Sequence, residues 1–306
     1  MKLQQAIQKF IEDQTGLVAS TTMEWHIKYL KPLSPLADKS VRRITTDDLR
    51  CIWNELATRE ERWSNHPSGR APAEGGLSPF TLANYVRCWR GFFRWCVEEG
   101  FAKQNPAERL PMPALPDQPP KALSPENLGR LLQAAKDSPR DYAIVCFLAD
   151  TGCRVGGLVK LNLDDVSLCK GRATVTEKGR GGGKTRTVYL KPRTRQAMRD
   201  YFVVRPEGDS NRVFLGTKGP LTTGGVYCVI KRLAQGTKIC GKWNPHAFRH
   251  GFARGAIENG ADLSEVAQLL GHDDVSVTAK FYARWDDDEL KVKHNEVSWL
   301  PDDDGE

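Results

Sequence analysis

The sequence lacks a long apolar run, and this absence argues against a membrane protein. Its longest unbroken apolar segment, Ala143 to Ala149, is far shorter than the roughly 20 residues that a membrane helix needs. The first residues, MKLQQAIQKFIEDQ, mix charges with apolar residues at helical spacing, unlike the continuous apolar core of a signal peptide. We therefore expect a cytoplasmic protein with no membrane partner.

Paired cysteines are absent as well. The eight cysteines never lie closer than seven positions apart, so the sequence has no CxxC motif for zinc binding or thiol exchange. Scattered thiols of this kind are typical of reduced, buried side chains.

Basic residues outnumber acidic residues outside the C-terminal tail. The chain has 45 Lys and Arg, 38 Asp and Glu and a net charge of +7, but residues 286–306 alone carry −7. The remaining residues therefore carry +14. An excess of this size favours a polyanion such as nucleic acid, because each Lys or Arg that neutralises a phosphate releases a counterion. A basic surface that serves only solubility is the alternative.

Residues 1–110 are predicted to form an all-helical domain. Apolar residues recur at three and four spacing over four ranges, which are 2–12, 19–29, 46–60 and 79–99. The proline-rich stretch over 111–123 then predicts an extended linker and a domain boundary.

The last of these predicted helices interleaves arginines with aromatic residues. Arg87, Arg90 and Arg94 form one stripe, while most aromatic side chains take the other side. We interpret the stripe as a DNA-binding face laid against a phosphate backbone. The alternative is a plain amphipathic helix whose charges face water.

Residues 124–290 are predicted to be mainly helical with a small sheet. The segment DYAIVCFLADTG predicts a buried helix, and RATVT and KTRTVYL predict two strands joined by the glycine-rich EKGRGGG. Further helices are expected at about 124 onward and at 192–203, 222–235, 246–259, 263–270 and 275–284. The expected fold class is therefore mainly α with a small antiparallel β-sheet, in two domains, with an acidic tail over 291–306.

Histidine is rare in this chain, yet HAFRHGFARG holds two of the six. His246, Arg249 and His250 stand at i, i+3 and i+4, so they share one face of a helix. Spacing alone leaves two interpretations open, which are a metal site and a clamp for an anion such as phosphate.

An arginine also follows the buried apolar segment, in TGCR. A guanidinium there needs an anion or a carboxylate. If the role of Arg154 is only structural, Asp150 or Asp164 is the expected partner.

The remaining candidates lie in the hairpin and near the C-terminus. Lys178 and Lys184 flank the glycine-rich tip, and His272 and Tyr282 lie in LLGHDDVSVTAKFY. Taken singly, a turn lysine is usually solvated and a tyrosine in a late helix usually packs.

Taken together, TGCR, the lysine of EKG, HAFRH, LLGH and FY resemble, in this order, the motifs of the tyrosine recombinase or phage integrase family. The resemblance covers about 124–290, and the helical first half is similar to that family's SAM-like core-binding domain. It implies the catalytic residues Arg154, Lys178, His246, Arg249, His272 and Tyr282. Lys184 and His250 are then expected to contact DNA without taking part in the chemistry.

One position departs from the family pattern. The first arginine is usually followed by an acid in RxxE, whereas this chain has Gly157 there. This departure implies either weaker activity or a replacement acid from elsewhere in the chain.

The resemblance implies a reaction that uses no metal ion or other cofactor. The hydroxyl of Tyr282 would attack a phosphodiester and leave a 3′-phosphotyrosyl ester and a free 5′-hydroxyl, which keeps the bond energy for rejoining. Arg154 and Arg249 would stabilise the charge on the phosphate oxygens. His246 would accept the tyrosine proton and Lys178 would supply one to the leaving oxygen.

This chemistry favours the anion clamp in HAFRH. A zinc helix of the HExxH kind has a glutamate after its first histidine, whereas Ala247 follows His246 here. The charge of Arg249 would also repel a metal ion between the two histidines.

The resemblance further implies a site-specific recombinase that acts in integration, excision or transposition of a mobile element. Its partners would be duplex DNA and three copies of itself, as a homo-tetramer on two DNA segments at the nucleoid. The alternatives are a type IB topoisomerase and a catalytically weakened DNA-binding regulator, and Gly157 favours the regulator. Trp299 and Leu300 would anchor the tail on a neighbouring protomer, with a disordered tail as the alternative.

Overall fold

A computed structural model of the chain describes residues 1–62, 71, 73–116, 122–177, 183–237, 239, 241–272, 274–282, 291 and 294. The chain divides into two compact units, Met1–Asp117 and Gln118–Glu306, and the division falls within the proline-rich stretch. None of the helices in the described ranges combines the length and the apolar character that crossing a bilayer requires.

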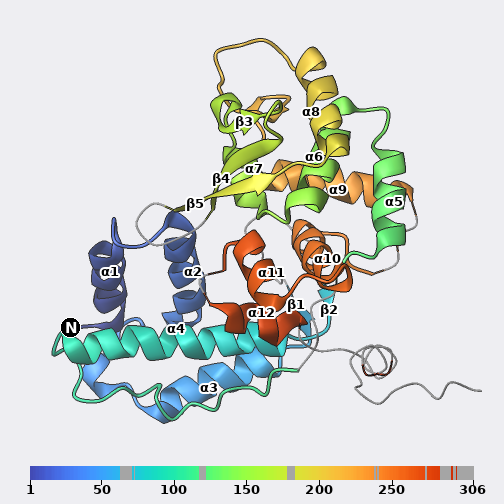
Figure 1. The fold of residues 1–306 in the computed structure, drawn as a ribbon. Helices are drawn as coiled ribbons and strands as arrows, with labels where there is room; N and C mark the ends of the chain where they lie inside the picture. The colour runs from blue at the N-terminus through green and yellow to red at the C-terminus, as the bar shows by residue number, and fades with distance from the viewer. Residues whose placement is uncertain are drawn as a thin grey trace, which may run out of the picture. The chain divides into compact units, whose positions relative to one another are not determined.

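The first unit is built from helices (Figure 1). Its elements are α1 (Leu3–Gln14), α2 (Ser20–Leu30), η1 (Lys31–Leu36), η2 (Val41–Arg43), α3 (Thr46–Ala57), β1 (Glu61–Arg62), β2 (Ala73–Glu74) and α4 (Pro79–Glu98). The four helices predicted from periodicity are present, with ends within three residues of those expected. The β1–β2 pair and the 3-10 turns were not predicted, because such short segments have no periodic pattern.

Helix α4 carries much of the core of this unit. Its start is fixed by the side chain of Ser78, which accepts the N–H of Thr81, and by Pro79 at the first helical position. Trp89 is fully buried, and its indole N–H donates to the carbonyl of Tyr29 on α2 at 2.8 Å. The aromatic side of the stripe therefore packs inward, as the amphipathic pattern predicts.

The second unit combines helices with a small sheet (Figure 1). Its elements are α5 (Pro125–Ala134), α6 (Pro139–Thr151), α7 (Val155–Lys160), η3 (Leu163–Asp165), β3 (Val166–Ser167), β4 (Arg172–Glu177), β5 (Lys184–Tyr189), α8 (Pro192–Val204), β6 (Leu215–Gly216), β7 (Gly219–Pro220), α9 (Thr223–Gly236), α10 (Pro245–Glu258), α11 (Leu263–Leu270) and α12 (Val275–Tyr282). The expected fold class, mainly α with small antiparallel sheets, is confirmed.

The main sheet has three strands in the order β3–β4–β5, all antiparallel. The sequence predicted only β4 and β5, because β3 has two residues and too little alternation to show. The β4–β5 ladder ends with Glu177 opposite Lys184. The residues that join these two strands, 178–182, lie outside the described part of the chain.

Helix α6 lies in the core of the second unit. Its residues from Ala143 to Leu148 are all buried, and it packs against α5, α8, α9 and α10. Each large apolar side chain buried in this way contributes about 1.5–3 kcal/mol. The fixed position of α6 determines where its C-terminal turn, and the arginine that follows, are placed.

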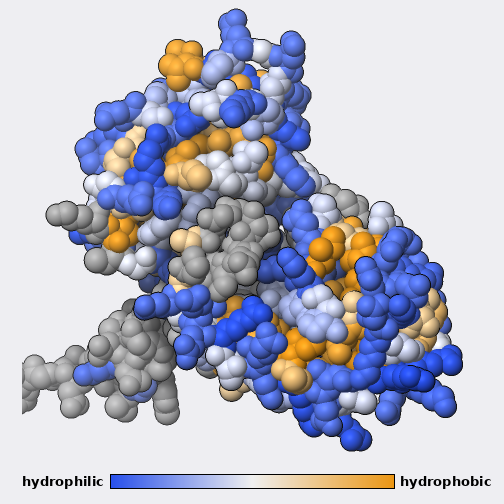
Figure 2. All heavy atoms as spheres, turned by 180° about the vertical axis from the view of Figure 1, so that it is seen from behind, coloured by the Kyte–Doolittle hydropathy of each residue, from blue (hydrophilic) through white to orange (hydrophobic). Residues whose placement is uncertain are grey.

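The surface is largely hydrophilic on the face shown in Figure 2. Charged and polar side chains cover most of each unit there, with smaller apolar patches between them. This distribution agrees with a chain in which 27% of the residues are charged.

Candidate active site

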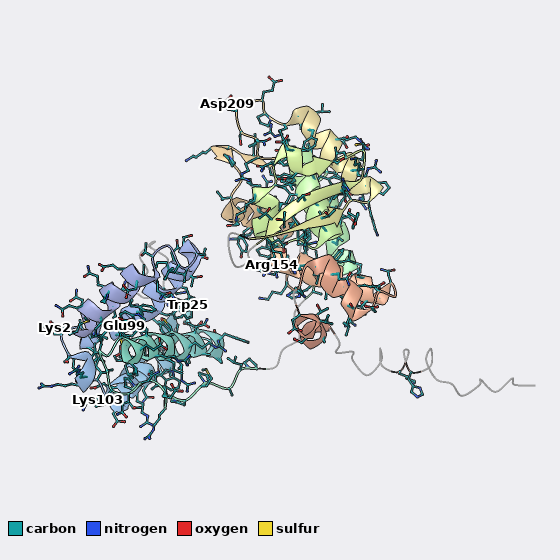
Figure 3. All side chains as sticks on the ribbon, turned by 60° about the vertical axis from the view of Figure 1, so that its left-hand side comes forward. Lys2, Trp25, Glu99, Lys103, Arg154 and Asp209 are labelled. Atoms are coloured by element: carbon teal, nitrogen blue, oxygen red, sulfur yellow. The ribbon has the colours of Figure 1, made fainter. Side chains whose placement is uncertain are left out.

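Arg154 is held by the turn that follows α6. Gly152 caps the helix with a φ of 55°, in the left-handed region, and its N–H donates to the carbonyl of Leu148. A Cβ on Gly152 would lie 2.7 Å from the ring of Phe252, so the backbone angle and the packing both require glycine. The turn leaves the Arg154 side chain 35% exposed, where the sheet meets the helices drawn in orange in Figure 3.

The carboxylate of Glu177 is the partner of Arg154. Glu177 is the last residue of β4 and is 3% exposed. Its Oε1 accepts the backbone N–H of Arg154 at 2.6 Å, and its Oε2 accepts the guanidinium at 2.5 Å. The partners suggested by the sequence, Asp150 and Asp164, were wrong, because both accept hydrogen bonds elsewhere, from the Lys191 amide and the Asn211 side chain.

Two further arginines lie close to the same carboxylate. Arg186 and Arg249 approach Oε1 of Glu177 at 3.5 and 3.8 Å. Burial alone would raise the pKa of the Glu177 carboxyl, but the amide of Arg154 and the three guanidiniums outweigh burial and hold this pKa below its usual value. Three guanidiniums around one ionised carboxylate leave a local charge of about +2, which favours a second anion.

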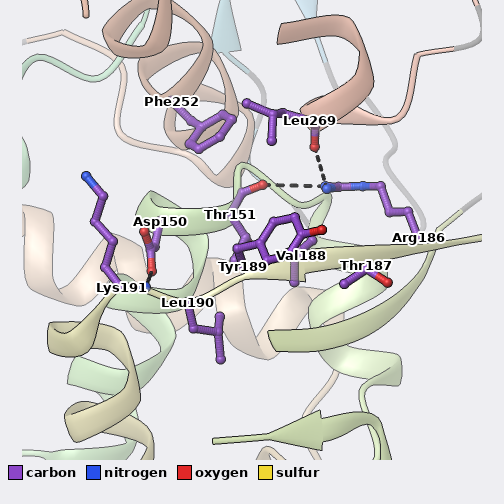
Figure 4. Close-up of a pocket in the computed structure, with 10 residues that line it drawn as sticks. All are labelled: Asp150, Thr151, Arg186, Thr187, Val188, Tyr189, Leu190, Lys191, Phe252 and Leu269. Atoms are coloured by element: carbon purple, nitrogen blue, oxygen red, sulfur yellow. Dashed lines mark hydrogen bonds between the residues drawn. The ribbon is translucent and has the colours of Figure 1, made fainter. Parts of the chain in front are cut away.

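Arg249 and Arg186 also join the ends of two helices. The buried guanidinium of Arg249 donates to the carbonyls of Gly152 and Leu270, at 2.9 and 2.8 Å. Arg186 donates to the preceding carbonyls of the same two segments, those of Thr151 and Leu269, at 3.5 and 2.5 Å (Figure 4). Helix C-termini carry a partial negative charge, so cations stabilise α6 and α11 at this junction.

His272 follows Gly271, the cap residue of α11, and lies near the arginines. Its Nδ1 is 2.7 Å from Oγ1 of Thr278, a fully buried residue of α12. Burial first, and then the charges of Arg249 and Arg154, lower the pKa of His272 to about 4. The imidazole is therefore neutral near pH 7 and can form a hydrogen bond to a phosphate oxygen without adding charge.

Helix α10 carries the two histidines of the HAFRH segment. Its start is set by Asn244, whose side chain accepts the N–H of Ala247, and by Pro245. His246 is exposed in the first turn, one turn before the buried Arg249. His250 is half-buried, and burial together with the charges of His246 and Arg249 lowers its pKa to about 4.

The structure describes the two lysines and the tyrosine only in part. Lys178 lies outside the described residues, although it follows Glu177 directly in the chain. Lys184 begins β5, exposed and opposite Glu177 in the ladder. Tyr282 is the final residue of α12, one turn after Thr278, and its side chain is outside the described part of the structure.

The sequence interpretation missed Glu177 and Arg186. Both are on strands: β4, which carries Glu177, packs against α7, and β5, which carries Arg186, pairs with β4. A signal was present for Glu177, since it follows Ala173 and Val175 at alternate positions and therefore shares their buried face. An acid on an apolar strand face requires a cationic partner.

The arginine stripe of α4 divides by exposure. Arg87 and Arg94 are exposed, whereas Arg90 is half-buried. The guanidinium of Arg90 donates to the carbonyls of Ala107 and Leu110, at 3.3 and 2.7 Å, and so fixes the segment that follows the helix. DNA binding by this stripe remains a prediction.

No group of three or more His, Cys, Asp or Glu residues with metal-binding geometry occurs within the described ranges. The guanidiniums and imidazoles that the described site does bring together suit a bound anion.

Comparison with known proteins identifies relatives. Residues 121–289 match the sequence profile of the phage integrase family. A tyrosine recombinase XerD from Listeria innocua is 34% identical over 213 residues, which cover 66% of this chain and 71% of that protein.

Solved structures extend the similarity over nearly the whole chain. The Tn1549 transposon integrase in complex with a circular intermediate DNA has a TM-score of 0.75 and 19% identity, covering 97% of this chain and 100% of that one. A lambda integrase tetramer bound to a Holliday junction has a TM-score of 0.71 and 17% identity, covering 94% of this chain and 80% of that one. At these identities the similarity shows a shared fold.

Proposed function

Because the chain belongs to the phage integrase family of tyrosine recombinases, which are DNA strand transferases, we propose that it cuts and rejoins duplex DNA at a specific site. The observation that carries this proposal is the cluster of Arg154, Arg186 and Arg249 around Glu177, whose excess positive charge fits a phosphodiester. Two guanidiniums held by fixed hydrogen bonds match the oxygens of a phosphate in geometry as well as charge.

In the proposed reaction, the Tyr282 oxygen attacks the scissile phosphorus as its proton passes to His246. The bond from phosphorus to the 5′-oxygen breaks, and Lys178 donates a proton to that leaving oxygen. Arg154 and Arg249 neutralise the charge that develops on the non-bridging oxygens. Rejoining follows the same steps in reverse, with a 5′-hydroxyl as the attacking group, so the number of phosphodiester bonds is unchanged.

The neutral state of His272 suits a supporting role in this reaction. An uncharged imidazole placed among arginines can donate its N–H to a phosphate oxygen and does not repel the guanidiniums. Its contact with Thr278 also ties the position of His272 to α12, the helix that ends at Tyr282.

For the biological role we propose integration, excision or transposition of a mobile element by a homo-tetramer on two DNA segments, at the nucleoid in the cytoplasm. The shared fold with a transposon integrase and with a tetrameric lambda integrase on a Holliday junction supports this role. Resolution of chromosome dimers, which uses the same chemistry on other sites, is the second candidate, favoured by the similarity to a Xer recombinase.

The test is covalent capture of DNA. Nicked duplexes tiled across the DNA that flanks the gene are incubated with the full chain, and protein linked to a 3′ end is isolated under denaturing conditions. We expect an adduct from the native chain and none from Tyr282→Phe. Absence of an adduct on every duplex would favour a DNA-binding regulator. Relaxation of supercoils by a monomer without site preference would favour a topoisomerase.

The captured site distinguishes the two biological roles. A sequence at the end of an element bounded by inverted repeats supports the mobile-element role. A site near the chromosome terminus supports dimer resolution.

A further inference from the structure

Gly157 and Glu177 share one small space between α7 and β4. An ideal Cβ on Gly157 would lie 3.2 Å from Cγ of Glu177 and 3.7 Å from its Oε1. Gly156, the preceding residue of the same helix, has nothing within 4 Å of the corresponding point. The position where the family pattern RxxE has its acid is thus directly faced by an acid from a strand.

We propose that Glu177 is the positioning residue for Arg154 and Arg249, and that it replaces, from β4, the acid that the usual pattern carries at position 157. This inference rests on the proposed strand-transfer function. It goes further, because it assigns a role to a residue outside the family motif.

The hydrogen bonds of Glu177 support this assignment. Its Oε1 binds the amide of Arg154 and its Oε2 binds the guanidinium, so the carboxylate fixes both the backbone and the side chain of that arginine. Because the Arg154 side chain is still 35% exposed, it can contact a phosphate while it is held. The guanidinium of Arg249, the second arginine proposed to bind the phosphate, lies 3.8 Å from Oε1 of Glu177, so the same carboxylate attracts it.

The burial of Glu177 points the same way. A carboxylate that is 3% exposed on an apolar strand face costs several kcal/mol unless it is paired. The pairing of Glu177 with the arginines is therefore needed for its burial. Small neighbours make the arrangement possible, since Gly157 supplies no side chain where the Glu177 methylene lies.

Placing the acid on β4 instead of α7 changes which parts of the site the carboxylate holds. An acid at 157 would hold the arginine from its own helix alone. An acid at 177 also fixes the C-terminal end of β4, which is the residue immediately before Lys178. In this chain, the arginines and the base of the lysine-bearing hairpin are therefore held by one side chain.

The experiment moves the carboxylate from position 177 to position 157. It compares the native chain with Glu177→Ala, Glu177→Gln, the relocation variant Glu177→Ala/Gly157→Glu and the matched control Glu177→Ala/Gly156→Glu. The rate of covalent adduct formation is measured against the concentration of the captured nicked duplex, with circular dichroism to quantify the folded fraction.

We expect Glu177→Ala to lower the rate at saturating DNA by about 10²-fold, because Arg154 and Arg249 lose the geometry in which they stabilise the charge of the transition state. The half-saturating DNA concentration should change by less than about threefold, because ground-state binding depends on many phosphate contacts. The relocation variant should react at least about tenfold faster than Glu177→Ala, and the Gly156→Glu control should react no faster than Glu177→Ala. Should Glu177→Ala not fold, Glu177→Gln keeps the shape without the charge and is expected to lose about tenfold.

Retention of the native rate within about threefold in folded Glu177→Ala or Glu177→Gln would overturn the proposal. Equal rescue from positions 156 and 157 would also overturn it, since then the added charge, and not its position, matters. If the native chain itself forms no adduct on any duplex, the proposed function fails first. If native and variant chains form adducts equally, only the role of Glu177 fails.

Discussion

Arg186 and Arg249 bridge the same two helix ends, one carbonyl apart. Arg249 donates to the last carbonyls at the ends of α6 and α11, and Arg186 to the carbonyl before each of them. Both guanidiniums also approach the carboxylate of Glu177. Residues proposed to act on the phosphate therefore also hold the second unit together, so their substitution affects stability as well as activity.

Replacement of Arg249 should destabilise the protein more than replacement of Arg154. Arg249→Ala removes two hydrogen bonds to buried carbonyls and an ion pair, so the free energy of unfolding should fall by about 3–5 kcal/mol. Arg154→Ala should cost less, because that side chain is partly exposed and pairs only through Glu177 among the described contacts. Urea denaturation of both variants checks this order, and an equal loss would contradict it.

Gly152 should tolerate no side chain. Gly152→Ala requires a left-handed φ of 55° and places a Cβ 2.7 Å from the Phe252 ring, so we expect a loss of about 1–3 kcal/mol in urea denaturation. Gly156→Ala is the matched control, because the site is helical and open within 4 Å, and it should be neutral or slightly stabilising. A Gly152→Ala variant as stable as the control would be inconsistent with the packing at this turn.

Stability should decline as the solution becomes mildly acidic. Burial, with neighbouring positive charges, lowers the pKa of His250 and of His272 to about 4, whereas an unfolded histidine titrates near 6.5. Between these values the unfolded chain binds more protons, so the free energy of unfolding falls from about pH 6.5 to about pH 4. Urea midpoints at about pH 7 and pH 5 measure the decline, which should be smaller in His250→Gln. An unchanged slope in that variant would show that His250 does not contribute.

The stripe on α4 should divide into DNA contacts and a packing residue. Arg87→Ala and Arg94→Ala should weaken binding to nonspecific duplex and lower the slope of log affinity against log salt by about 1 each. Arg90→Ala should instead reduce the melting temperature, because it loses its bonds to the carbonyls of Ala107 and Leu110. Fluorescence anisotropy over a salt series, with thermal melts, distinguishes these effects. A melting loss at Arg87 equal to that at Arg90 would contradict the division.

Periodicity predicted most of the fold because most of its helices are amphipathic or wholly buried. The predicted starts at 79 and 246 lie within one residue of the starts of α4 and α10, which Ser78 and Asn244 cap in the structure. The β3 strand, the β1–β2 pair and the β6–β7 pair were missed. Each has two-residue strands whose pairing is set by tertiary contacts and leaves no pattern in the sequence.

The candidate site was predictable where residues follow an ordered motif and not where strands bring residues together. The motif order indicated Arg154, Arg249 and His272, and the structure places the two arginines close enough to His272 for their charges to lower its pKa. The partner of Arg154 was sought nearby in the chain, at Asp150 or Asp164, but Glu177 reaches it from 23 positions away. Sequence distance is a poor guide to ion pairs, because strand β4 returns along α7.

The space shared by positions 157 and 177 also restricts how this arrangement arose. A glutamate on the strand and a side chain at the helix position would crowd each other, since a Cβ at position 157 would lie only 3.2 Å from Cγ of Glu177. Lineages that share the strand acid should therefore carry glycine at the helix position, and lineages with the helix acid should carry a small residue on the strand. The two positions are expected to covary as a mutually exclusive pair across descendants of a common ancestor.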